Sequence, residues 1–399
     1  MVGHVDHGKT TLTQALSGTW TDTHSEERKR GISIKLGYAD TAFFRTNDGV
    51  HYSKGKHPEG EEDSIDDLQR VVSFVDAPGH ETLMAVMISG ASIMDGALLL
   101  VAATEKCPQP QTREHLAALE IAGIENIVIV QNKIDIVSRD RALESFNEIK
   151  EFVNGTIAED APIIPVSAHH DVNLDMLISA IEETIPTPDR ADEEGGLMYV
   201  ARSFDVNRPG SKPNELKGGI IGGSIVHGSF SIGDSIVIAP GRRVNQGNKT
   251  HWETLKTKID GIKGGGVSLE KAFAGGLCGI ATPLDPLITK ADDLSGQVMA
   301  REGELPPIWE EMKLDLQLLD KTISSNTGEI ESIRPLQPNE MLMINSATAT
   351  SVGTIKTIKS KKVTIKLRLP ICARKGSRIT LSRRVGSRWR LIGHGTISG

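Results

Sequence analysis

The sequence has few cysteines, no long apolar run and no leader-like start. Its three cysteines, Cys107, Cys278 and Cys372, lie far apart, so they offer neither a disulfide framework nor a zinc pair, as in proteins of reducing compartments. No run of about 18 apolar residues occurs, which excludes a transmembrane helix. The first residues, MVGHVDHGKT, lack the basic start and apolar stretch of a signal peptide. We therefore expect a cytoplasmic protein that does not contact a membrane.

Acidic residues are absent from one end of the chain. The 399 residues carry 45 Lys+Arg and 52 Asp+Glu, a net charge of −7, yet residues 341–399 contain 13 Lys+Arg and no Asp or Glu. Such a basic block predicts contact with a polyanion, and a solvated surface is the alternative. The basic residues in it include Lys361, Lys362, Arg383 and Arg384.

The chain lacks internal repeats, and its pattern changes twice along its length. The first ~185 residues alternate short apolar runs with helical patterns, which predicts an α/β domain with a mostly parallel sheet and helices on both faces. Glycine-punctuated β-branched runs follow and predict two all-β barrel domains. We predict domains at 1–190, 197–303 and 304–399, the last basic at its C-terminal part, with a charged surface-loop insert at 43–68 in the first domain.

Residues 3–10, GHVDHGKT, match the phosphate-loop pattern G-x-x-x-x-G-K-[ST]. Glycines allow backbone N–H groups to turn toward phosphate oxygens, and the N-terminus of the following helix adds a positive dipole. Lys9 would neutralise the β- and γ-phosphates, and the Thr10 hydroxyl would bind Mg²⁺. The pattern is short enough to occur by chance, so it favours nucleotide binding without deciding it.

A second motif, Asn132-Lys133-Ile134-Asp135, follows the apolar run 127–130 and predicts the base. Its aspartate can accept hydrogen bonds from N1 and the 2-amino group of guanine, which adenine cannot match, and a buried carboxylate without partners is costly. The asparagine and lysine would brace the base and the phosphate loop. Ser167 and Ala168, after the run 163–166, would contact the guanine oxygen through the backbone.

A third motif, at residues 76–80, reads DAPGH. Asp76 would hold Mg²⁺ through water, and the N–H of Gly79 would respond to the γ-phosphate. His80 occupies the position where small GTPases have a glutamine that orients the attacking water; a partly buried structural histidine is the alternative.

A fourth motif, RGIS at residues 30–33, suits a switch segment. The Ser33 hydroxyl could reach Mg²⁺ and the γ-phosphate only in the triphosphate state, so the segment would become ordered on GTP binding. Taken alone, it is a short amphipathic strand.

The four motifs occur in order within 185 residues, and two β domains follow. This arrangement resembles a translational GTPase of the elongation factor Tu type, with an α/β P-loop GTPase domain. Residues 20–27 (WTDTHSEE), 90–97 (GASIMDGA), 106–112 (KCPQPQT) and 202–207 (RSFDVN) narrow the resemblance to the gamma subunit of archaeal and eukaryotic translation initiation factor two. The archaeal type is favoured because long eukaryotic-type extensions are absent.

The resemblance implies a GTP hydrolase that binds initiator methionyl-tRNA in its GTP state and delivers it to the small ribosomal subunit. It implies a heterotrimer, with an alpha subunit on the second domain and a beta subunit on the GTPase domain. An elongation-factor-type carrier of another aminoacyl-tRNA, such as selenocysteyl-tRNA, is the alternative within the class. A GTP-binding scaffold that does not hydrolyse GTP is disfavoured by Lys9, Asp76 and His80, and an ATP-dependent kinase by Asp135.

The resemblance also assigns roles to individual residues. His80 is the predicted catalytic residue, Thr10, Ser33 and Asp76 the predicted ligands of a first Mg²⁺, and Asp6 and Gly31 those of a second. The predicted nucleotide-binding residues are Asp6, His7, Gly8, Lys9, Thr10, Thr11, Gly79, Asn132, Lys133, Ile134, Asp135, Ser167, Ala168 and His169.

Three features depart from the family pattern. The insert at 43–68 has no cysteine, whereas many family members carry a four-cysteine zinc knuckle there, so we expect no bound zinc. Ser33 replaces the usual threonine and leaves the hydroxyl rotamer freer. A phosphate loop should follow a buried central strand of some five residues, and only two residues precede Gly3, so we expect the natural chain to begin further upstream.

Overall fold

The computed structural model describes twelve segments of the chain. They are residues 1–22, 36–79, 87–88, 93–190, 194–208, 210, 212, 215–247, 249–319, 321–323, 330–386 and 388–399. These residues form two compact units. The first contains Met1–Thr187, Ile323–Glu331 and Val385–Leu391, and the second contains Pro188–Thr322, Ser332–Arg384 and Ile392–Gly399. No helix in these segments is long and apolar enough to cross a bilayer.

The first unit is built on a parallel sheet with strand order β1-β5-β6-β7. Every residue of β5 and β6 is buried, because both faces of the sheet are covered, and this explains why these runs are continuously apolar. The sequence-based prediction of a mostly parallel sheet is confirmed. The strands are β1 (Val2–Gly3), β5 (Ala97–Ala102), β6 (Ile127–Asn132) and β7 (Ile163–Pro165).

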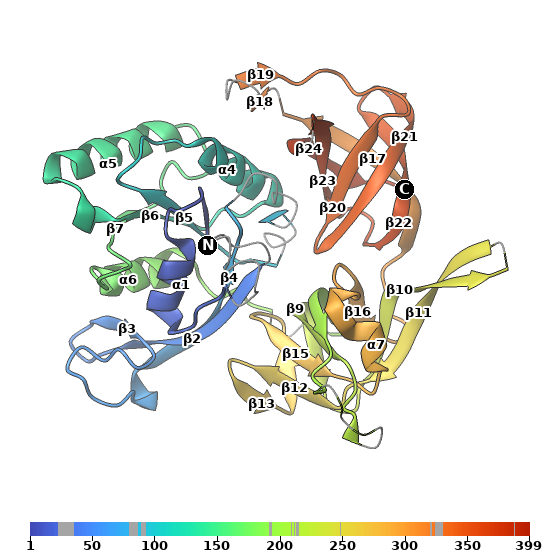
Figure 1. Ribbon diagram of the computed structural model, residues 1–399, viewed down its shortest axis with the longest axis horizontal. Coiled ribbons are helices and arrows are strands. Elements are labelled where there is room, and N and C mark those ends of the chain that lie inside the picture. Colours follow the sequence, from blue (N-terminus) through green and yellow to red (C-terminus); the bar gives the residue numbers. More distant parts are fainter. Residues whose placement is uncertain are drawn as a thin grey trace. The chain divides into compact units, whose positions relative to one another are not determined.

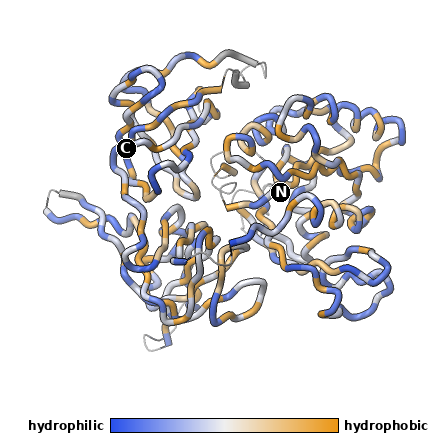
Figure 2. Tube along the Cα trace, turned by 180° about the vertical axis from the view of Figure 1, so that it is seen from behind, coloured by the Kyte–Doolittle hydropathy of each residue, from blue (hydrophilic) through white to orange (hydrophobic). Residues whose placement is uncertain are grey.

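Helices cover both faces of this sheet, as predicted. In Figure 1, α4 and α5 lie on one side of the sheet and α1 and α6 on the other. Leucine and isoleucine side chains of α1 and α6, such as Leu12, Leu16 and Leu177, form one core with Leu98 and Val128 of the strands. Figure 2 shows hydrophobic colours along the interior strands of this unit. The helices are α1 (Lys9–Ser17), α4 (Pro110–Ala122), α5 (Arg139–Val153) and α6 (Leu174–Thr184).

The strand before the phosphate loop consists of two paired residues. Val2 and Gly3 of β1 align with Leu99 and Leu100 of β5. On its other side, Met1 O accepts a hydrogen bond from Ala77 N at 3.1 Å. The segment thus lies between β5 and the end of β4 (Leu68–Asp76), where a central strand was expected.

The insert at 43–68 is more ordered than the predicted surface loop. Its ends belong to an antiparallel sheet of order β3-β2-β4, formed by β2 (Gly37–Arg45), β3 (His51–Ser53) and β4. The prediction of a surface loop is wrong there because aromatic side chains provide a small core. The rings of Phe44 and Tyr52 stack at 5.2 Å, and His57 lies against Tyr52 at 4.9 Å.

The second unit begins with a nine-stranded, all-antiparallel sheet of order β11-β10-β16-β8-β9-β15-β12-β13, with β14 paired to β9. It surrounds one apolar core that includes Met198, Ile221, Ile238 and Met299, and α7 (Pro286–Thr289) follows β15. The strands are β8 (Gly196–Phe204), β9 (Ile220–Ser231), β10 (Ser235–Gln246), β11 (Lys249–Lys258), β12 (Gly261–Gly264), β13 (Val267–Leu269), β14 (Lys271–Phe273), β15 (Cys278–Ala281) and β16 (Val298–Arg301).

A closed barrel of order β17-β22-β21-β20-β23-β24 completes this unit. Closure removes the exposed strand edges that an open sheet would offer to other chains, and the predicted β-barrel fold class is confirmed. The barrel strands are β17 (Ile308–Leu318), β20 (Met341–Ser346), β21 (Ala349–Lys359), β22 (Lys362–Cys372), β23 (Arg378–Val385) and β24 (Arg388–Ile397), and the short strands β18 (Lys321–Ile323) and β19 (Ile330–Ser332) pair separately.

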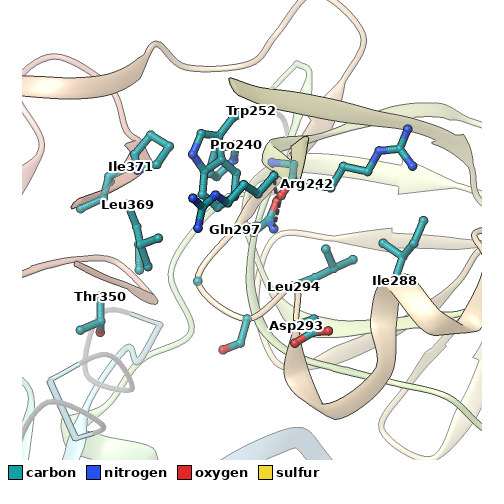
Figure 3. Close-up of a pocket in the computed structure, with 16 residues that line it drawn as sticks. Pro240, Arg242, Trp252, Ile288, Asp293, Leu294, Gln297, Thr350, Leu369 and Ile371 are labelled. Atoms are coloured by element: carbon teal, nitrogen blue, oxygen red, sulfur yellow. Dashed lines mark hydrogen bonds between the residues drawn. The ribbon is translucent and has the colours of Figure 1, made fainter. Parts of the chain in front are cut away.

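A cavity of about 350 Å³ lies within the second unit, between the nine-stranded sheet and the closed barrel. Figure 3 shows Trp252, Pro240 and Gln297 on its sheet side and Leu369 and Ile371 on its barrel side. The buried Gln297 carboxamide donates to the carbonyl and accepts from the N–H of the Gly241 backbone. Each end of this carboxamide in the cavity wall therefore makes a hydrogen bond.

Two basic residues of the C-terminal block, Arg383 and Arg390, are buried. Arg383 is 4% exposed, and its Nε donates to Glu340 Oε1 at 2.5 Å. Its Nη1 donates to the carbonyl of Arg334 at 2.7 Å. A buried guanidinium whose hydrogen bonds are made within the chain is not available to an external polyanion, so Arg383 does not contribute to a polyanion surface.

Candidate functional site

The loop between β1 and α1 requires glycine at two positions. Gly3 has φ +142°, and a Cβ there would lie 2.5 Å from Leu100 O. Gly8 has φ +91°, and a Cβ there would lie 2.3 Å from Asn132 Nδ2. Gly8 is also the N-cap of α1 and makes no side-chain cap bond. The first amides of α1 are therefore positioned to receive an anion.

Lys9 folds back over this loop. Its buried Nζ donates to the carbonyls of His4 at 2.7 Å and Gly3 at 3.1 Å. Burial lowers the pKa of Lys9 to about 8, and the carboxylates of Asp76 and Asp6 oppose that shift. Among the described residues, the hydrogen-bond acceptors of this ammonium are carbonyl groups, so a phosphate would restore a full counter-charge.

Asp76, at the end of β4, accepts hydrogen bonds from two hydroxyl groups. Its Oδ2 accepts from Thr10 Oγ1 and from Thr21 Oγ1, each at 2.7 Å. Its Oδ1 is buried and has no hydrogen-bond partner among the residues that the structure describes. A carboxylate with an unused oxygen beside a threonine hydroxyl is the donor set that Mg²⁺ prefers. Sequence reasoning named Thr10 and Asp76 and missed Thr21, which lay in a stretch used only for the resemblance.

Gly79 lies directly over the lysine. A Cβ on Gly79 would be 2.5 Å from Lys9 Nζ and 2.9 Å from Val5 N. Only a residue without a side chain fits so close to the phosphate loop without displacing it. Gly79 is therefore beside the lysine, as expected of a residue that responds to the terminal phosphate.

Asn132 joins three motifs that are far apart in the sequence. Its Nδ2 donates to His7 O at 2.9 Å, and its Oδ1 accepts from Ala168 N at 3.1 Å. The side chain is 2% exposed. A buried carboxamide with both ends bonded fixes the distance between the phosphate loop and the predicted base-binding segments.

The predicted guanine-reading residues also converge. Lys133 has φ +64° and precedes the 3-10 helix Ile134–Ile136 that carries Asp135. A hydrogen bond from the Ser167 side chain is the largest cause that lowers the pKa of Asp135. The carboxylate is therefore ionised at neutral pH and can accept two hydrogen bonds from a base edge. Two histidines, His169 and His170, add smaller favourable charge effects.

His7 is structural. Its ring is buried, with Nδ1 3.0 Å from Leu100 O, and burial lowers its pKa to about 4. The imidazole is neutral near pH 7 and adds no charge to a phosphate site, so only its backbone can serve there. Asp6, with φ +61°, lies in the loop, and Thr11 follows in the first turn of α1.

His115 of α4 is a site residue that sequence reasoning missed. Its Nδ1 accepts a hydrogen bond from Gly3 N at 2.8 Å, and the ring is 1% exposed. Burial lowers the pKa of His115 to about 3, with Lys9 contributing, so Nδ1 remains an acceptor. A histidine within an amphipathic helix has no distinguishing sequence pattern, and only the fold shows that it holds the phosphate loop.

Three predicted residues, His80, Gly31 and Ser33, lie outside the described residues, so their roles stay predictions. The remaining predicted positions come together at the carboxyl ends of the parallel strands, where ligands bind in α/β folds.

Comparison with known proteins identifies the family. The family described as "Elongation factor Tu GTP binding domain" matches residues 1–187, and "Initiation factor eIF2 gamma, C terminal" matches residues 310–397. The Methanocaldococcus jannaschii "Translation initiation factor 2 subunit gamma" is 55% identical over 400 residues, which cover 100% of this chain and 96% of that protein. The chain belongs to the gamma-subunit family of translation initiation factor 2.

Other comparisons agree with this family. The gamma subunit of Thermoplasma acidophilum is 53% identical over 400 residues, 100% of this chain and 95% of that protein. Among solved structures, a bacterial selenocysteine-specific elongation factor, EF-Sec, has a TM-score of 0.74 at 23% identity, covering 99% of this chain and 56% of its own. The elongation factor SelB of Methanococcus maripaludis, with a GTP analogue, has a TM-score of 0.71 at 21% identity, covering 100% and 78%. These two likenesses show the fold alone.

Membership of the gamma-subunit family makes the chain a translation initiation GTPase that binds GTP and GDP. The geometry agrees with that activity. The glycine loop and Lys9 face one end of the site, and Asp135 with Ser167 faces the other. Asn132 ties the two ends together, so a nucleotide would span them with its phosphates toward α1.

Proposed function

We propose that this family member is the GTPase subunit of a heterotrimer that binds initiator methionyl-tRNA in its GTP state. It then delivers that tRNA to the small ribosomal subunit. The observation that carries the proposal is 55% identity along the whole chain to a protein named as the gamma subunit of translation initiation factor 2. The likeness extends beyond the nucleotide site into both β domains, where a carrier needs surfaces of its own.

The proposed division of labour follows the three predicted domains. Residues 1–190 bind and hydrolyse GTP and receive a beta subunit. Residues 197–303 receive an alpha subunit and, with the first domain, the aminoacyl end of the tRNA. Residues 304–399 complete the chain. The family match at residues 1–187 and the separate match at 310–397 support the outer two domains.

The proposed nucleotide-site residues divide into those that bind phosphates and those that recognise guanine. Amides at the start of α1 and the Lys9 ammonium bind phosphates, while Asp135 and the segment at Ser167 read guanine. The complete proposed set is Asp6, His7, Gly8, Lys9, Thr10, Thr11, Gly79, Asn132, Lys133, Ile134, Asp135, Ser167, Ala168 and His169. Among them, His7 would act through its backbone, because its ring is buried and neutral.

The residues present fit a Mg²⁺ ion. Thr10 and Asp76 supply hydroxyl and carboxylate oxygens, and the unpartnered Asp76 Oδ1 leaves a coordinating position. Ser33 is the proposed third protein ligand, and Asp6 and Gly31 are the proposed ligands of a second ion. When bound, Mg²⁺ offsets charge on the β- and γ-phosphates. No zinc is proposed, because the insert lacks cysteine; metal analysis that finds one zinc per chain would overturn this.

His80 is the proposed catalytic residue, and it orients water for in-line attack on the γ-phosphate. Lys9 offsets charge that develops in the transition state. In a single-turnover assay with ribosomes, we expect His80→Ala to slow GTP hydrolysis about 100-fold. The control is His251→Ala, an exposed position on β11. Equal hydrolysis by His80→Ala and wild type would remove His80 from the mechanism.

The carrier function is tested by filter binding of initiator methionyl-tRNA in the presence of the alpha subunit. We expect GTP to give about tenfold or tighter binding than GDP, as allosteric coupling commonly does. Elongator methionyl-tRNA and selenocysteyl-tRNA serve as competitors. Equal affinity in the two nucleotide states would contradict the proposal, and preference for selenocysteyl-tRNA would favour the elongation-factor alternative.

A further inference from the structure

The closed barrel carries a second cavity, remote in sequence from the nucleotide motifs. It is an open hollow of about 540 Å³ at the barrel surface, next to the turn between β21 and β22. Both strands are labelled in Figure 1. The turn, residues 359–362, reads Lys-Ser-Lys-Lys. The other lining residues include Asp315 and Gln317 of the neighbouring strand β17, and His394 and Thr396 of β24. All of these residues belong to the second compact unit.

The lysines of this turn repel one another, which lowers the stability of the folded barrel. Lys359 and Lys362 are directly opposite each other in the β21–β22 register, and like charges in such pairs destabilise a sheet. Lys361 adds a third ammonium between them. Among the described residues that line the cavity, the acidic one is Asp315. Two positive charges therefore remain in excess.

The single carboxylate neutralises little of this charge. Asp315 Oδ1 lies 3.5 Å from Lys362 Nζ, with side-chain exposures of 48% and 71%. Exposed pairs of this kind contribute about 0–1 kcal/mol. Elsewhere in the barrel, Arg383 is already held by Glu340. The accessible lysine charge at this turn is thus not balanced within the cavity.

Neutral hydrogen-bonding groups surround the lysines. Gln317 and Thr396 offer amide and hydroxyl groups, and Ser360 offers a hydroxyl from the turn itself. His394 Nδ1 is buried and has no hydrogen-bond partner within the described part of the chain. Hydroxyl and amide groups beside ammonium groups suit an oxyanion that accepts several hydrogen bonds at once.

The lining favours a phosphate backbone over a base. Among the described residues that line the cavity there is no Phe, Tyr, Trp or Arg. The imidazole of His394 is the one aromatic ring among these described residues, and none of them has a planar guanidinium group of the kind that recognises bases. Lysine acts as a point charge that contacts phosphate oxygens without sequence preference. The lining therefore suits contact with the phosphate backbone of a nucleic acid strand, independent of the base sequence.

We propose that this cavity binds phosphate groups of an RNA backbone through Lys359, Lys361 and Lys362. The inference rests on the proposed function, which places two RNA molecules against the chain: the initiator tRNA and the RNA of the small ribosomal subunit. Both present the same chemistry, and the experiment separates them.

The test compares two triple variants of the full chain. The site variant is Lys359→Gln, Lys361→Gln and Lys362→Gln. The control variant is Lys356→Gln, Lys366→Gln and Lys375→Gln, which removes the same charge from exposed lysines of the same barrel outside the cavity. Thermal melting monitors folding. The site variant should melt no lower than wild type, because it relieves the repulsion between Lys359 and Lys362.

Binding is measured as a function of KCl concentration, with initiator methionyl-tRNA plus GTP in one arm and purified small ribosomal subunits in the other. Each lysine that contacts a phosphate contributes about one to the slope of log K against log salt. We expect the site variant to lose about 2–3 from the slope in one arm, which identifies the RNA source. The control variant should lose less than about 1.

Three results would overturn the proposal. Equal slopes for the site and control variants in both arms would make the turn an ordinary solvated surface. If the site variant and wild type have the same salt slope, the lysines contact no phosphate. Unchanged RNA slopes with loss of poly-L-glutamate binding would assign the cavity to an acidic polypeptide.

The carrier function has a separate readout. It is the ratio of methionyl-tRNA affinities with GTP and GDP in wild type at one salt concentration. If that ratio is near one, the carrier proposal fails while the small-subunit arm still tests the lysines. If the ratio is large and neither slope changes, the RNA site fails alone.

Discussion

The side chain of Asn132 donates from Nδ2 to the backbone carbonyl of His7 at 2.9 Å, across 125 positions of sequence. Its other end accepts from Ala168 N. One buried carboxamide thus connects the phosphate loop to both segments expected to hold guanine. Because buried amide partners that lose their bonds are costly, this connection makes phosphate and base binding depend on each other.

Asn132→Ala should weaken GDP binding by about 30-fold or more. The change leaves His7 O and Ala168 N without their partner, at about 1–3 kcal/mol for each unsatisfied group. Stopped-flow release of a fluorescent GDP analogue measures the effect as a faster dissociation rate. The matched control is Asn126→Ala, whose side chain bonds only to Asp95 O at 3.4 Å. Similar rates in both variants would show that Asn132 does not link the motifs.

Asp135→Ala should remove discrimination between GTP and ITP. Inosine lacks the 2-amino group, so wild type should prefer GTP by about 100-fold or more because its ionised carboxylate loses a partner with ITP. In the variant, the two nucleotides should bind within a few-fold of each other. Competition against a fluorescent nucleotide measures both affinities. A variant that retained the full preference would place base recognition elsewhere.

His115 should make stability depend on pH in a defined window. Its folded pKa of about 3 lies below the ordinary value of about 6.5, so between these values the unfolded chain binds more protons than the native one. The free energy of unfolding therefore rises with pH and falls as pH drops below about 6.5. His115→Gln keeps an acceptor for Gly3 N and removes the titration.

Urea unfolding at pH 6.5 and pH 5 checks this dependence. Wild type should lose about 2 kcal/mol more than His115→Gln over that interval, since one pKa unit corresponds to about 1.4 kcal/mol. Other titrating groups affect both proteins equally, which is why the difference between them is the measured quantity. Parallel pH profiles would show that His115 does not stay neutral.

One cysteine should react with thiol reagents while two should not. Burial raises the pKa of Cys107 and of Cys372 to about 12, so almost no thiolate exists at pH 8, and the thiolate is the reactive form. Cys278 is half-buried. Ellman's reagent should therefore titrate one thiol of three in the native chain, and Cys278→Ser should abolish the fast phase. Fast reaction of two or more thiols would contradict the burial.

Much of the fold could be predicted because it depends on local patterns. The apolar runs 127–130 and 163–166 correspond to β6 and β7, and the alternation of such runs with helical patterns predicted the parallel sheet and its helices. The glycines at positions 3 and 8 were recognisable because their backbone conformations exclude most other residues. The insert at 43–68 was misjudged since its charge concealed a small aromatic core around Tyr52.

By itself, the sequence predicted which residue types would meet the nucleotide. A phosphate loop, a guanine-reading aspartate and their order are short motifs whose chemistry follows from residue identity and spacing. The resemblance they carry agrees with the family that full-length comparison shows.

Only the tertiary structure decided which of those residues hold one another. In the folded chain, the buried ring of His115 accepts a hydrogen bond from Gly3 N, and the Thr21 hydroxyl donates one to Asp76. Folding also removed Arg383 from the surface. The physical reason is that such contacts join segments far apart in the chain, and their energies depend on shared burial that no local pattern encodes.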